Sequence, residues 1–363
     1  MRKLLVYTLH LSIMVSLFLL GCSKPASTQQ PGRTVTDRLG RTVTIPDRVE
    51  KIVAIGVGAL RLYTYAGSLD KLVGVEQVEH SADPGRPYTQ INEALFASLP
   101  IIGQGGPNNS PDPERLLNVS PDVIFTTYAA NAADADQLQR NIGIPVIALQ
   151  YGNSFWGEDV RKSLELIGEV TGDLTKAKAA SDFIASCYDD LQYRTKDILD
   201  KPSVYIGALG FRGAHGIEST QGQFAPFLAL NANNVVDETG QTGSVMIDKE
   251  KLIEWAPDIM FLDVNGYASV LEDYQSNARY YDSLAPVQND SVYGMLPYNF
   301  LTTNIDTAIV NTYYMGTIIY PEAFADIDAL QKADEIYKAL LGQEFYQQMV
   351  TDFGGFQKLS VGK

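Results

Sequence analysis

The chain has 363 residues, of which 45% are apolar and 20% charged, and its formal net charge is −15. This length and apolar content suffice for two folded domains and exclude a wholly disordered protein. Because phosphate backbones would repel so acidic a chain, the composition also argues against nucleic acid as a partner.

The first 21 residues have the composition of a lipoprotein signal peptide. Arg2 and Lys3 precede a mostly apolar run from 4 to 20, and Gly21-Cys22 follows. We expect cleavage before Cys22, lipid on its thiol, and anchoring to the cell membrane on its extracytoplasmic face, whether periplasmic or cell-surface. The alternative is an uncleaved membrane helix, but the run is short and contains four polar residues. Residues 22–33 lack apolar periodicity and are typical of a flexible tether.

The part of the chain from 34 to 149 alternates short apolar segments with helical ones. Residues 34–46 predict a β-hairpin around Leu39-Gly40, and 51–56 predict a buried strand followed by a helix over 59–66. Further strands are predicted at 71–75, 101–103, 122–127 and 145–149. Strands separated by helices favour βαβ units on a parallel sheet.

The same alternation returns after residue 200. Strands are predicted at 203–209, 258–263 and 291–296, and helices at 224–230, 249–255 and 306–319. The segments 112–125 and 248–261 match without a gap at a constant offset of 136. Each predicts a short helix, then a Pro-Asp pair, then a strand. The sequence therefore predicts two similar α/β halves.

Between the halves, residues 173–200 contain no Gly or Pro and carry apolar residues at helical spacing. This stretch follows a helix at 160–170 and predicts a long helix joining two lobes. The expected organisation is a first lobe at 34–172, a connecting helix at 173–200 and a second lobe at 201–363. Beyond Cys22 the chain has only Cys187, which we expect to be a core residue in that helix without a disulfide partner.

Together, the lipobox, the hairpin, the paired Pro-Asp repeats and the mid-chain helix resemble the class III substrate-binding proteins of ABC importers for ferric siderophores, haem and cobalamin. The resemblance covers residues 34 to about 341 and implies two Rossmann-like α/β lobes joined by one long helix, with a ligand cleft between them. It also implies a monomer that binds without catalysing a reaction and that works with a permease dimer and its ATPase.

The family docks on its permease through one acidic residue on each lobe. Here Arg61 stands at the first of these positions, and the second falls near Ala225. The docking residues are therefore left open, with Glu76 and Glu238 as candidates.

Ligand residues are expected in the loops at the carboxyl ends of the parallel strands. These loops are rich in aromatic, cationic and amide side chains, which suit a flat or anionic chelate. The candidates are Arg86, Tyr88, Tyr128, Tyr151, Trp156, Arg212, His215, Asn265, Tyr298 and Asn299. No cofactor is expected, and the ligand could be a ferric siderophore, haem, a corrinoid or another metal chelate. A bare transition metal is disfavoured, because the mature chain offers only His80, His215 and Cys187 as soft or imidazole ligands.

Two other functions compete with this hypothesis. An exported hydrolase would need a nucleophile beside a base, and no G-x-S-x-G, H-E-x-x-H or S-x-x-K motif occurs in a fitting context. A surface sensory or adhesion protein could share the fold, because a fold does not determine function.

Overall fold

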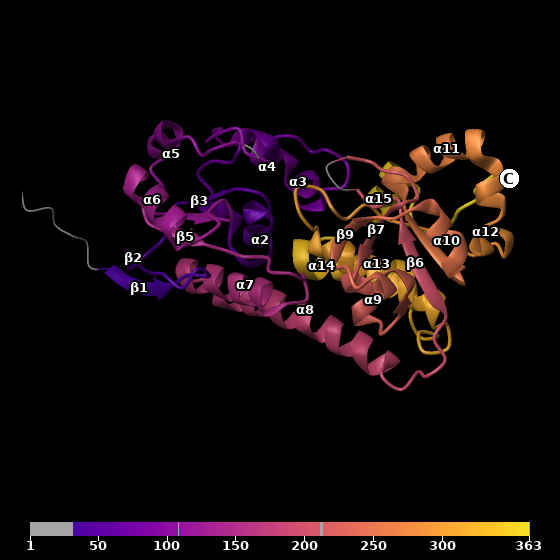
Figure 1. The fold of residues 1–363 in the computed structure, drawn as a ribbon. Helices are drawn as coiled ribbons and strands as arrows, with labels where there is room; N and C mark the ends of the chain where they lie inside the picture. The colour runs from indigo at the N-terminus through magenta and orange to yellow at the C-terminus, as the bar shows by residue number, and fades with distance from the viewer. Residues whose placement is uncertain (1–31, 108, 211–212, 363) are drawn as a thin grey trace, which may run out of the picture.

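The computed structural model describes residues 32–107, 109–210 and 213–362, which form two α/β lobes (Figure 1). The first lobe is indigo to magenta and the second orange to yellow, and the long helix α8 (Leu174–Thr195) runs from one to the other. The expected signal peptide, Cys22, most of the tether and Arg212 lie outside the described residues. No helix in the described ranges is both long and apolar enough to cross a membrane.

The chain enters the first lobe through the predicted hairpin. Strands β1 (Gly32–Thr36) and β2 (Thr42–Pro46) pair antiparallel, with Val35 opposite Val43. Both valines are buried while their neighbours in each strand point outward, so the alternation seen in the sequence is an inside-outside alternation. The side chain of Asp37 accepts the backbone N–H groups of Leu39 and Arg41 and closes the turn.

The sheet of the first lobe is parallel and has the order β3-β4-β5. Its strands β3 (Ile52–Ile55), β4 (Val123–Thr126) and β5 (Val146–Ala148) are buried at every position, as expected for a sheet covered on both faces. The predicted strands 71–75 and 101–103 form only single bridges, Leu72 to Ile52 and Val75 to Ile101. The chain turns into 3-10 helices directly before Leu72 and shortly after Val75, which leaves too few extended residues for a ladder.

Helices surround this sheet. They are α2 (Ala59–Ala66), α3 (Pro87–Ile91), α4 (Glu93–Ser98), α5 (Pro113–Val119), α6 (Ala132–Ile142) and α7 (Glu158–Thr171), with the 3-10 helices η1 (Leu69–Lys71) and η2 (Gln77–Glu79). Helix α2 begins after Gly58, whose φ of 80° lies in the left-handed region that favours glycine. All eight residues of α2 are buried, so this helix is a core element rather than a surface one.

The sheet of the second lobe has the order β12-β11-β10-β6-β8. Strands β6 (Ser203–Gly207), β8 (Asn233–Asn234), β10 (Ile259–Asp263) and β11 (Val292–Met295) are parallel, and β12 (Gln357–Lys358) is antiparallel at the edge. Strands β7 (Ser219–Gly222) and β9 (Gly243–Met246) pair separately. The three strands predicted in this half are thereby confirmed.

The second lobe is completed by helices on both sides of the sheet. They are α9 (Ala225–Ala229), η3 (Val235–Thr239), α10 (Lys249–Trp255), α11 (Val264–Asp282), α12 (Ala285–Gln288), α13 (Ile305–Ile319), α14 (Ala329–Leu341) and α15 (Tyr346–Phe353). Asn265, expected in a loop after the strand at 258–263, instead lies in the first turn of α11. The cause is local, because the carboxylate of Asp263 accepts the backbone N–H of Asn265 at 2.9 Å and caps the helix.

The sequence repeat is a structural repeat. Asp112 caps α5 and Asp248 caps α10, and each helix ends in a left-handed residue before a buried strand. The aspartates of the two Pro-Asp pairs also have the same role. Asp122 accepts the N–H of Lys51 at 2.9 Å and Asp258 accepts the N–H of Ser203 at 2.7 Å, so each fixes the start of the neighbouring strand.

The lobes are joined at more than one place. Helix α8 has 22 residues, shorter than the expected 173–200, and contacts α2 and α7 in the first lobe and α9, α13 and α14 in the second. Cys187 is buried in this helix. Helix α14 provides a further connection, because it packs on α2 and α3 of the first lobe. One hydrophobic core therefore extends through both lobes.

Candidate ligand-binding site

Two pockets lie at the boundary between the lobes. The tyrosine pocket, of about 120 Å³, is lined by first-lobe residues 151–155 and by Gln221, Ala225, Tyr298, Asn299 and 302–303 of the second lobe. The loop pocket, of about 350 Å³, is lined by Val57 and Pro107 of the first lobe and by Gly210, Gly213, Asn265 and 299–302 of the second. Together they form the interlobe cleft.

The cleft follows from the sheet topology. Val57 comes shortly after β3, and the segment 151–155 comes after β5. In the second lobe Gly210, Asn265 and Asn299 follow β6, β10 and β11. Because the carboxyl ends of parallel strands meet at one edge of a sheet, each lobe turns that edge toward the other.

The described lining of the cleft carries no charged side chain, and it is mainly polar in the tyrosine pocket and mainly apolar in the loop pocket. Hydrogen-bonding groups come from amides such as Asn153, Gln221 and Asn299, and from hydroxyls such as those of Tyr298 and Thr303. Such a lining offers neutral hydrogen bonds to a ligand rather than ion pairs.

The segment 299–303, here called the strap, separates the two pockets. It lies between β11 and α13 and is closed by an antiparallel bridge between Asn299 and Thr303. Leu301 and Thr302 have φ angles of 50° and 67°, and the left-handed region is unusual for a β-branched residue. Each such residue costs about 1–3 kcal/mol, so surrounding contacts must hold the strap in place.

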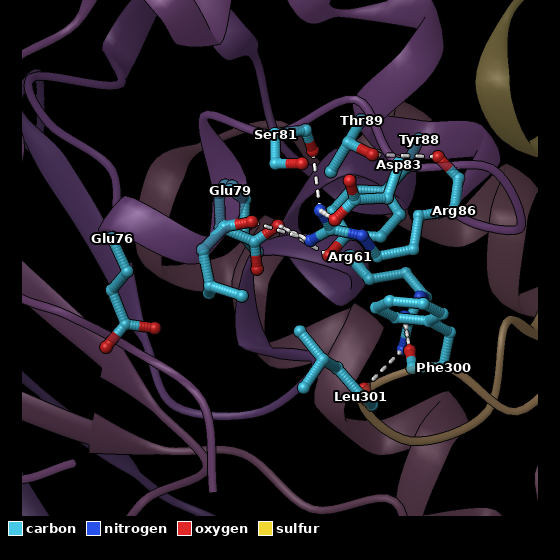
Figure 2. Close-up of polar contacts among 12 residues, drawn as sticks. Arg61, Glu76, Glu79, Ser81, Asp83, Arg86, Tyr88, Thr89, Phe300 and Leu301 are labelled. Carbon is cyan, nitrogen blue, oxygen red and sulfur yellow. Dashed lines mark hydrogen bonds and ion pairs between the residues drawn. The ribbon is translucent and has the colours of Figure 1, made fainter. Parts of the chain in front are cut away.

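Arg61 supplies those contacts from the first lobe (Figure 2). Its guanidinium donates to the carbonyl oxygens of Phe300 at 2.8 Å, Leu301 at 3.2 Å and Thr303 at 3.1 Å. The side chain is 0% exposed and lies over the ring of Tyr88. Burial alone lowers the pKa of Arg61, but the oxygens of Tyr151, Tyr88 and Tyr65 outweigh burial and raise it above its ordinary value, so the guanidinium stays charged.

A second buried arginine lies beside the first. Arg86 pairs with Glu79 at 3.2 Å and donates to the carbonyl oxygens of Val78 and Ser81. Glu79 also accepts the hydroxyl proton of Tyr88 at 2.6 Å. Burial raises the pKa of Glu79, although Arg86 and Tyr88 act in the opposite direction. The Arg86 guanidinium lies over the ring of Phe300, which links this cluster to the strap (Figure 2).

Each lobe also has a buried carboxyl group behind the cleft. Glu76 accepts the N–H of Gly56, next to Val57 of the loop pocket. Asp263 accepts the N–H groups of Asn265 and Gly210, which both line that pocket. Burial raises the pKa of each carboxyl group to about 7. The two lobes thus fix their strand-to-helix turns in the same way.

Four of the ten residues predicted as ligand contacts line the interlobe cleft. Tyr151 and Tyr298 line the tyrosine pocket, Asn265 lines the loop pocket, and Asn299 lines both. Arg212 lies outside the described residues, although its chain neighbours Gly210 and Gly213 line the loop pocket.

The remaining predicted residues lie elsewhere. Arg86 and Tyr88 are 0% exposed and bind Glu79, so they cannot touch a ligand in this conformation. Tyr128 is exposed and lines a separate first-lobe pocket with Ser110 and Pro113. Trp156 packs on Phe155 and on Tyr188 of α8, and its indole N–H donates to Ala225. His215 is partly buried, with its carbonyl close to Gly266, and lines neither pocket.

The expected docking positions do not face outward. Arg61 is buried under the strap, and Ala225 lines the tyrosine pocket. Of the two alternative acids, Glu76 is 5% exposed and cannot meet a permease arginine, whereas Glu238 is exposed. Within the described ranges, no group of three His, Cys, Asp or Glu side chains could hold a metal ion.

Comparison with known proteins supports the architecture. The chain is 22% identical over 327 residues to the uncharacterized ABC transporter substrate-binding lipoprotein YvrC of Bacillus subtilis, over 86% of this chain and 96% of YvrC. It is 23% identical over 347 residues to the molybdate-binding protein MolA of Haemophilus influenzae, over 87% and 91% of the two chains.

Solved structures agree with this likeness. The structure of MolA bound to molybdate has a TM-score of 0.64 with 19% identity, over 86% of this chain and 98% of MolA. A periplasmic solute binding protein of Veillonella parvula has a TM-score of 0.68 with 16% identity, over 89% and 97%. The model of the periplasmic binding protein family matches residues 63–298, which include parts of both lobes and all of α8. The chain therefore belongs to the periplasmic binding protein family.

Proposed function

We propose that the protein is the substrate-binding subunit of an ABC importer and that it captures a metal-containing anion, either a chelate or an oxyanion, in the interlobe cleft. The observation that carries the proposal is that both lobes line the same two pockets and that both contribute hydrogen-bonding side chains to the tyrosine pocket. Cavities between domains are common places for small-molecule ligands. YvrC is named as a subunit of this kind, and MolA binds molybdate.

The chemistry of the cleft fits an anion held by neutral donors. Asn153, Asn265 and Asn299 carry amide N–H groups, and Tyr298 and Thr303 carry hydroxyls. Fixed neutral dipoles can stabilise a negative charge without the strong pairing that would slow release to a permease. A ferric siderophore, haem, a corrinoid and a small metal oxyanion all present oxygen atoms that such donors could bind.

Delivery requires the protein to stay near its transporter. Lipid on Cys22 would hold the mature chain at the extracytoplasmic face of the membrane, and residues 22–33 would let the monomer reach a permease dimer, which works with an ATPase on the other side. Metabolic labelling with a fatty acid tests the anchor. Label should enter the wild-type chain and be absent from Cys22→Ser, and labelled Cys22→Ser would contradict this part of the proposal.

The ligand can be found by a thermal-shift screen of the chain from residue 23 onward. The probes are molybdate, a ferric catecholate siderophore, hemin and cyanocobalamin. A probe at 100 times its dissociation constant should stabilise the fold by about 2.7 kcal/mol, which raises the melting temperature by a few degrees.

The cleft is tested by substituting one residue from its lining. Asn299→Ala removes an amide shared by both pockets and should reduce the shift given by the active probe. Asn141→Ala, on the separate first-lobe pocket, is the matched control and should leave the shift unchanged. Equal shifts in wild type and Asn299→Ala would place the ligand outside the cleft.

A further inference from the structure

The strap belongs to the second lobe but is held mainly by the first. Three of its carbonyl oxygens accept from Arg61, and the ring of Phe300 lies over the Arg86 guanidinium at 5.2 Å. The next residue, Asn304, donates to the carbonyl oxygen of Gly85 at 2.8 Å and is 0% exposed. Five polar or ring contacts thus cross the lobe boundary within five residues of chain.

The fit between the strap and the start of α2 is close. A Cβ atom on Gly58 would lie 2.5 Å from the Thr302 side chain and 2.6 Å from the Tyr151 hydroxyl oxygen. That hydroxyl in turn donates to the carbonyl oxygen of Gly58 at 3.1 Å and contacts Arg61 at 3.3 Å. The strap therefore approaches the first lobe most closely at Gly58, where the absence of a side chain leaves room for Thr302.

Within the described part of the chain, Arg61 has no carboxylate among its hydrogen-bond partners. The carbonyl oxygens of the strap and the hydroxyl of Tyr151 are its acceptors, and its Nε has none. A charged group that is 0% exposed cannot give up these acceptors without a large desolvation cost. The cation and the strained strap therefore hold each other in place.

The position of the strap sets the size of the cleft. Asn299 and Thr302 line both pockets, so the strap is the wall between them. The tyrosine pocket, of about 120 Å³, is smaller than the ~300–1,000 Å³ typical of sites for drug-sized ligands, and the loop pocket, of about 350 Å³, lies at the lower limit. A flat tetrapyrrole would need the two volumes joined.

We propose that Arg61 is a positioning residue that fixes the strap across the cleft and thereby restricts the ligand to a compact one, such as a metal oxyanion or a small chelate, and excludes tetrapyrroles. This inference rests on the proposed capture of a metal-containing anion and adds the size of that ligand. It also gives Arg61 a role that a docking residue on the surface would not have.

The experiment compares wild type, Arg61→Met and Arg61→Lys by calorimetric titration with molybdate and hemin and by hydrogen exchange of the strap amides. Arg61→Met keeps the volume of the side chain but removes its donors and charge, and Arg61→Lys keeps the charge with fewer donors. We expect strap exchange to increase by about tenfold or more in Arg61→Met and less in Arg61→Lys. The ratio of hemin to molybdate affinity, at 1:1 stoichiometry, should rise by about tenfold in Arg61→Met.

Arg41→Met is the matched control. Arg41 is also a buried first-lobe arginine, but its hydrogen bonds go to Asp37, Asp136, Gln139 and Val146 within that lobe. Its loss should lower stability without changing strap exchange or the affinity ratio. If Arg61→Met fails to fold, Arg61→Lys provides the same comparison.

Three results decide the proposal. Unchanged strap exchange in a folded Arg61 variant would overturn the role of Arg61, and a wild-type chain that binds hemin more tightly than molybdate would overturn the size limit. If no probe binds any variant while the strap is released in Arg61→Met, the proposed ligand class is overturned and the role of Arg61 is supported.

Discussion

The two lobes are built on the same repeat, yet they contribute very different elements to the cleft. Both contain a capped helix, a Pro-Asp pair whose aspartate fixes the neighbouring strand, and a buried strand. Across the cleft, the first lobe presents the short buried helix α2 with Arg61, and the second presents the strained strap. The comparison teaches that local sequence signals specify the repeated scaffold, whereas contacts between distant residues specify the site.

The largest expected effect tests whether the repeats are equivalent in energy as well as in shape. Leu116 and Leu252 occupy matching positions, are 0% and 1% exposed, and belong to two smaller apolar clusters, one in each lobe, beside the shared core. Each Leu→Ala change should lower the free energy of unfolding by about 2–5 kcal/mol through lost burial and a cavity. Urea unfolding, followed by tryptophan fluorescence, measures both.

Because one core extends through both lobes, each variant should still unfold in a single transition. The exposed Leu117 lies next to Leu116 and supplies the control Leu117→Ala, with a loss below about 1 kcal/mol. Two separate transitions in either core variant would show that the lobes are independent.

A smaller effect tests the difference between the lobes at the strap. Gly58→Ala places a methyl group against Thr302 and Tyr151, and it also forces alanine into a left-handed conformation. Gly143→Ala is the control, because Gly143 has a similar φ of 75° and no atom within 4 Å of an added Cβ. The control should lose about 1 kcal/mol, and Gly58→Ala should lose about 1–3 kcal/mol more from the clash.

Thermal unfolding of the two glycine variants measures the difference. Equal losses would mean that the strap moves aside freely, and they would count against a fixed wall in the cleft.

The smallest effect concerns a feature that the lobes share, the buried carboxyl group behind the cleft. Glu76, with an ordinary pKa of 4.5, has a pKa of about 7 in the folded chain, because burial disfavours its charge and the nearby Glu79 adds repulsion. Between pH 4.5 and about pH 7, Glu76 is therefore protonated in the folded state and ionised in the unfolded state. Stability should fall as pH rises through this range and level off above it.

Glu76→Gln should remove this contribution. We expect the variant to gain about 2–3 kcal/mol relative to wild type at pH 8 and little at pH 5. Asp263→Asn should behave alike, because burial raises the pKa of Asp263 to about 7 as well. Urea unfolding at the two pH values measures both variants. A gain that is equal at pH 5 and pH 8 would contradict the raised pKa.

Much of the scaffold could be predicted from the sequence. Periodicity and turn residues predicted the hairpin, the strands β3, β4, β5, β6, β10 and β11, and helices α2, α10 and α13 to within one or two residues. The strands at 71–75 and 101–103 were overestimated, because apolar content does not reveal how soon the chain turns. The packing of α14 on the first lobe was missed, since no local pattern encodes a contact with α2 and α3.

The lining of the cleft was predicted only in part, and the role of its residues in ligand binding stays a prediction. Tyr151, Asn265, Tyr298 and Asn299 line the cleft as expected, because the carboxyl ends of strands can be located from the sequence. Arg86 and Tyr88 follow the same rule but are buried, which depends on the position of Glu79. Arg61 was noted only because it occupies a position where the family has an acidic docking residue. One signal could have indicated its burial, since it is the only charged residue in the apolar helix predicted over 59–66.

The packing of α14 on α2 and α3 has a consequence for how the chain folds as it emerges from its amino-terminal end. The last helix assigned to the first lobe, α7, ends at Thr171, but the helix that covers part of this lobe is complete only at Leu341. While the following half of the chain emerges, the face of the first lobe that α14 will cover remains exposed to solvent. Such late, long-range closure slows folding and favours association with chaperones over the intervening period.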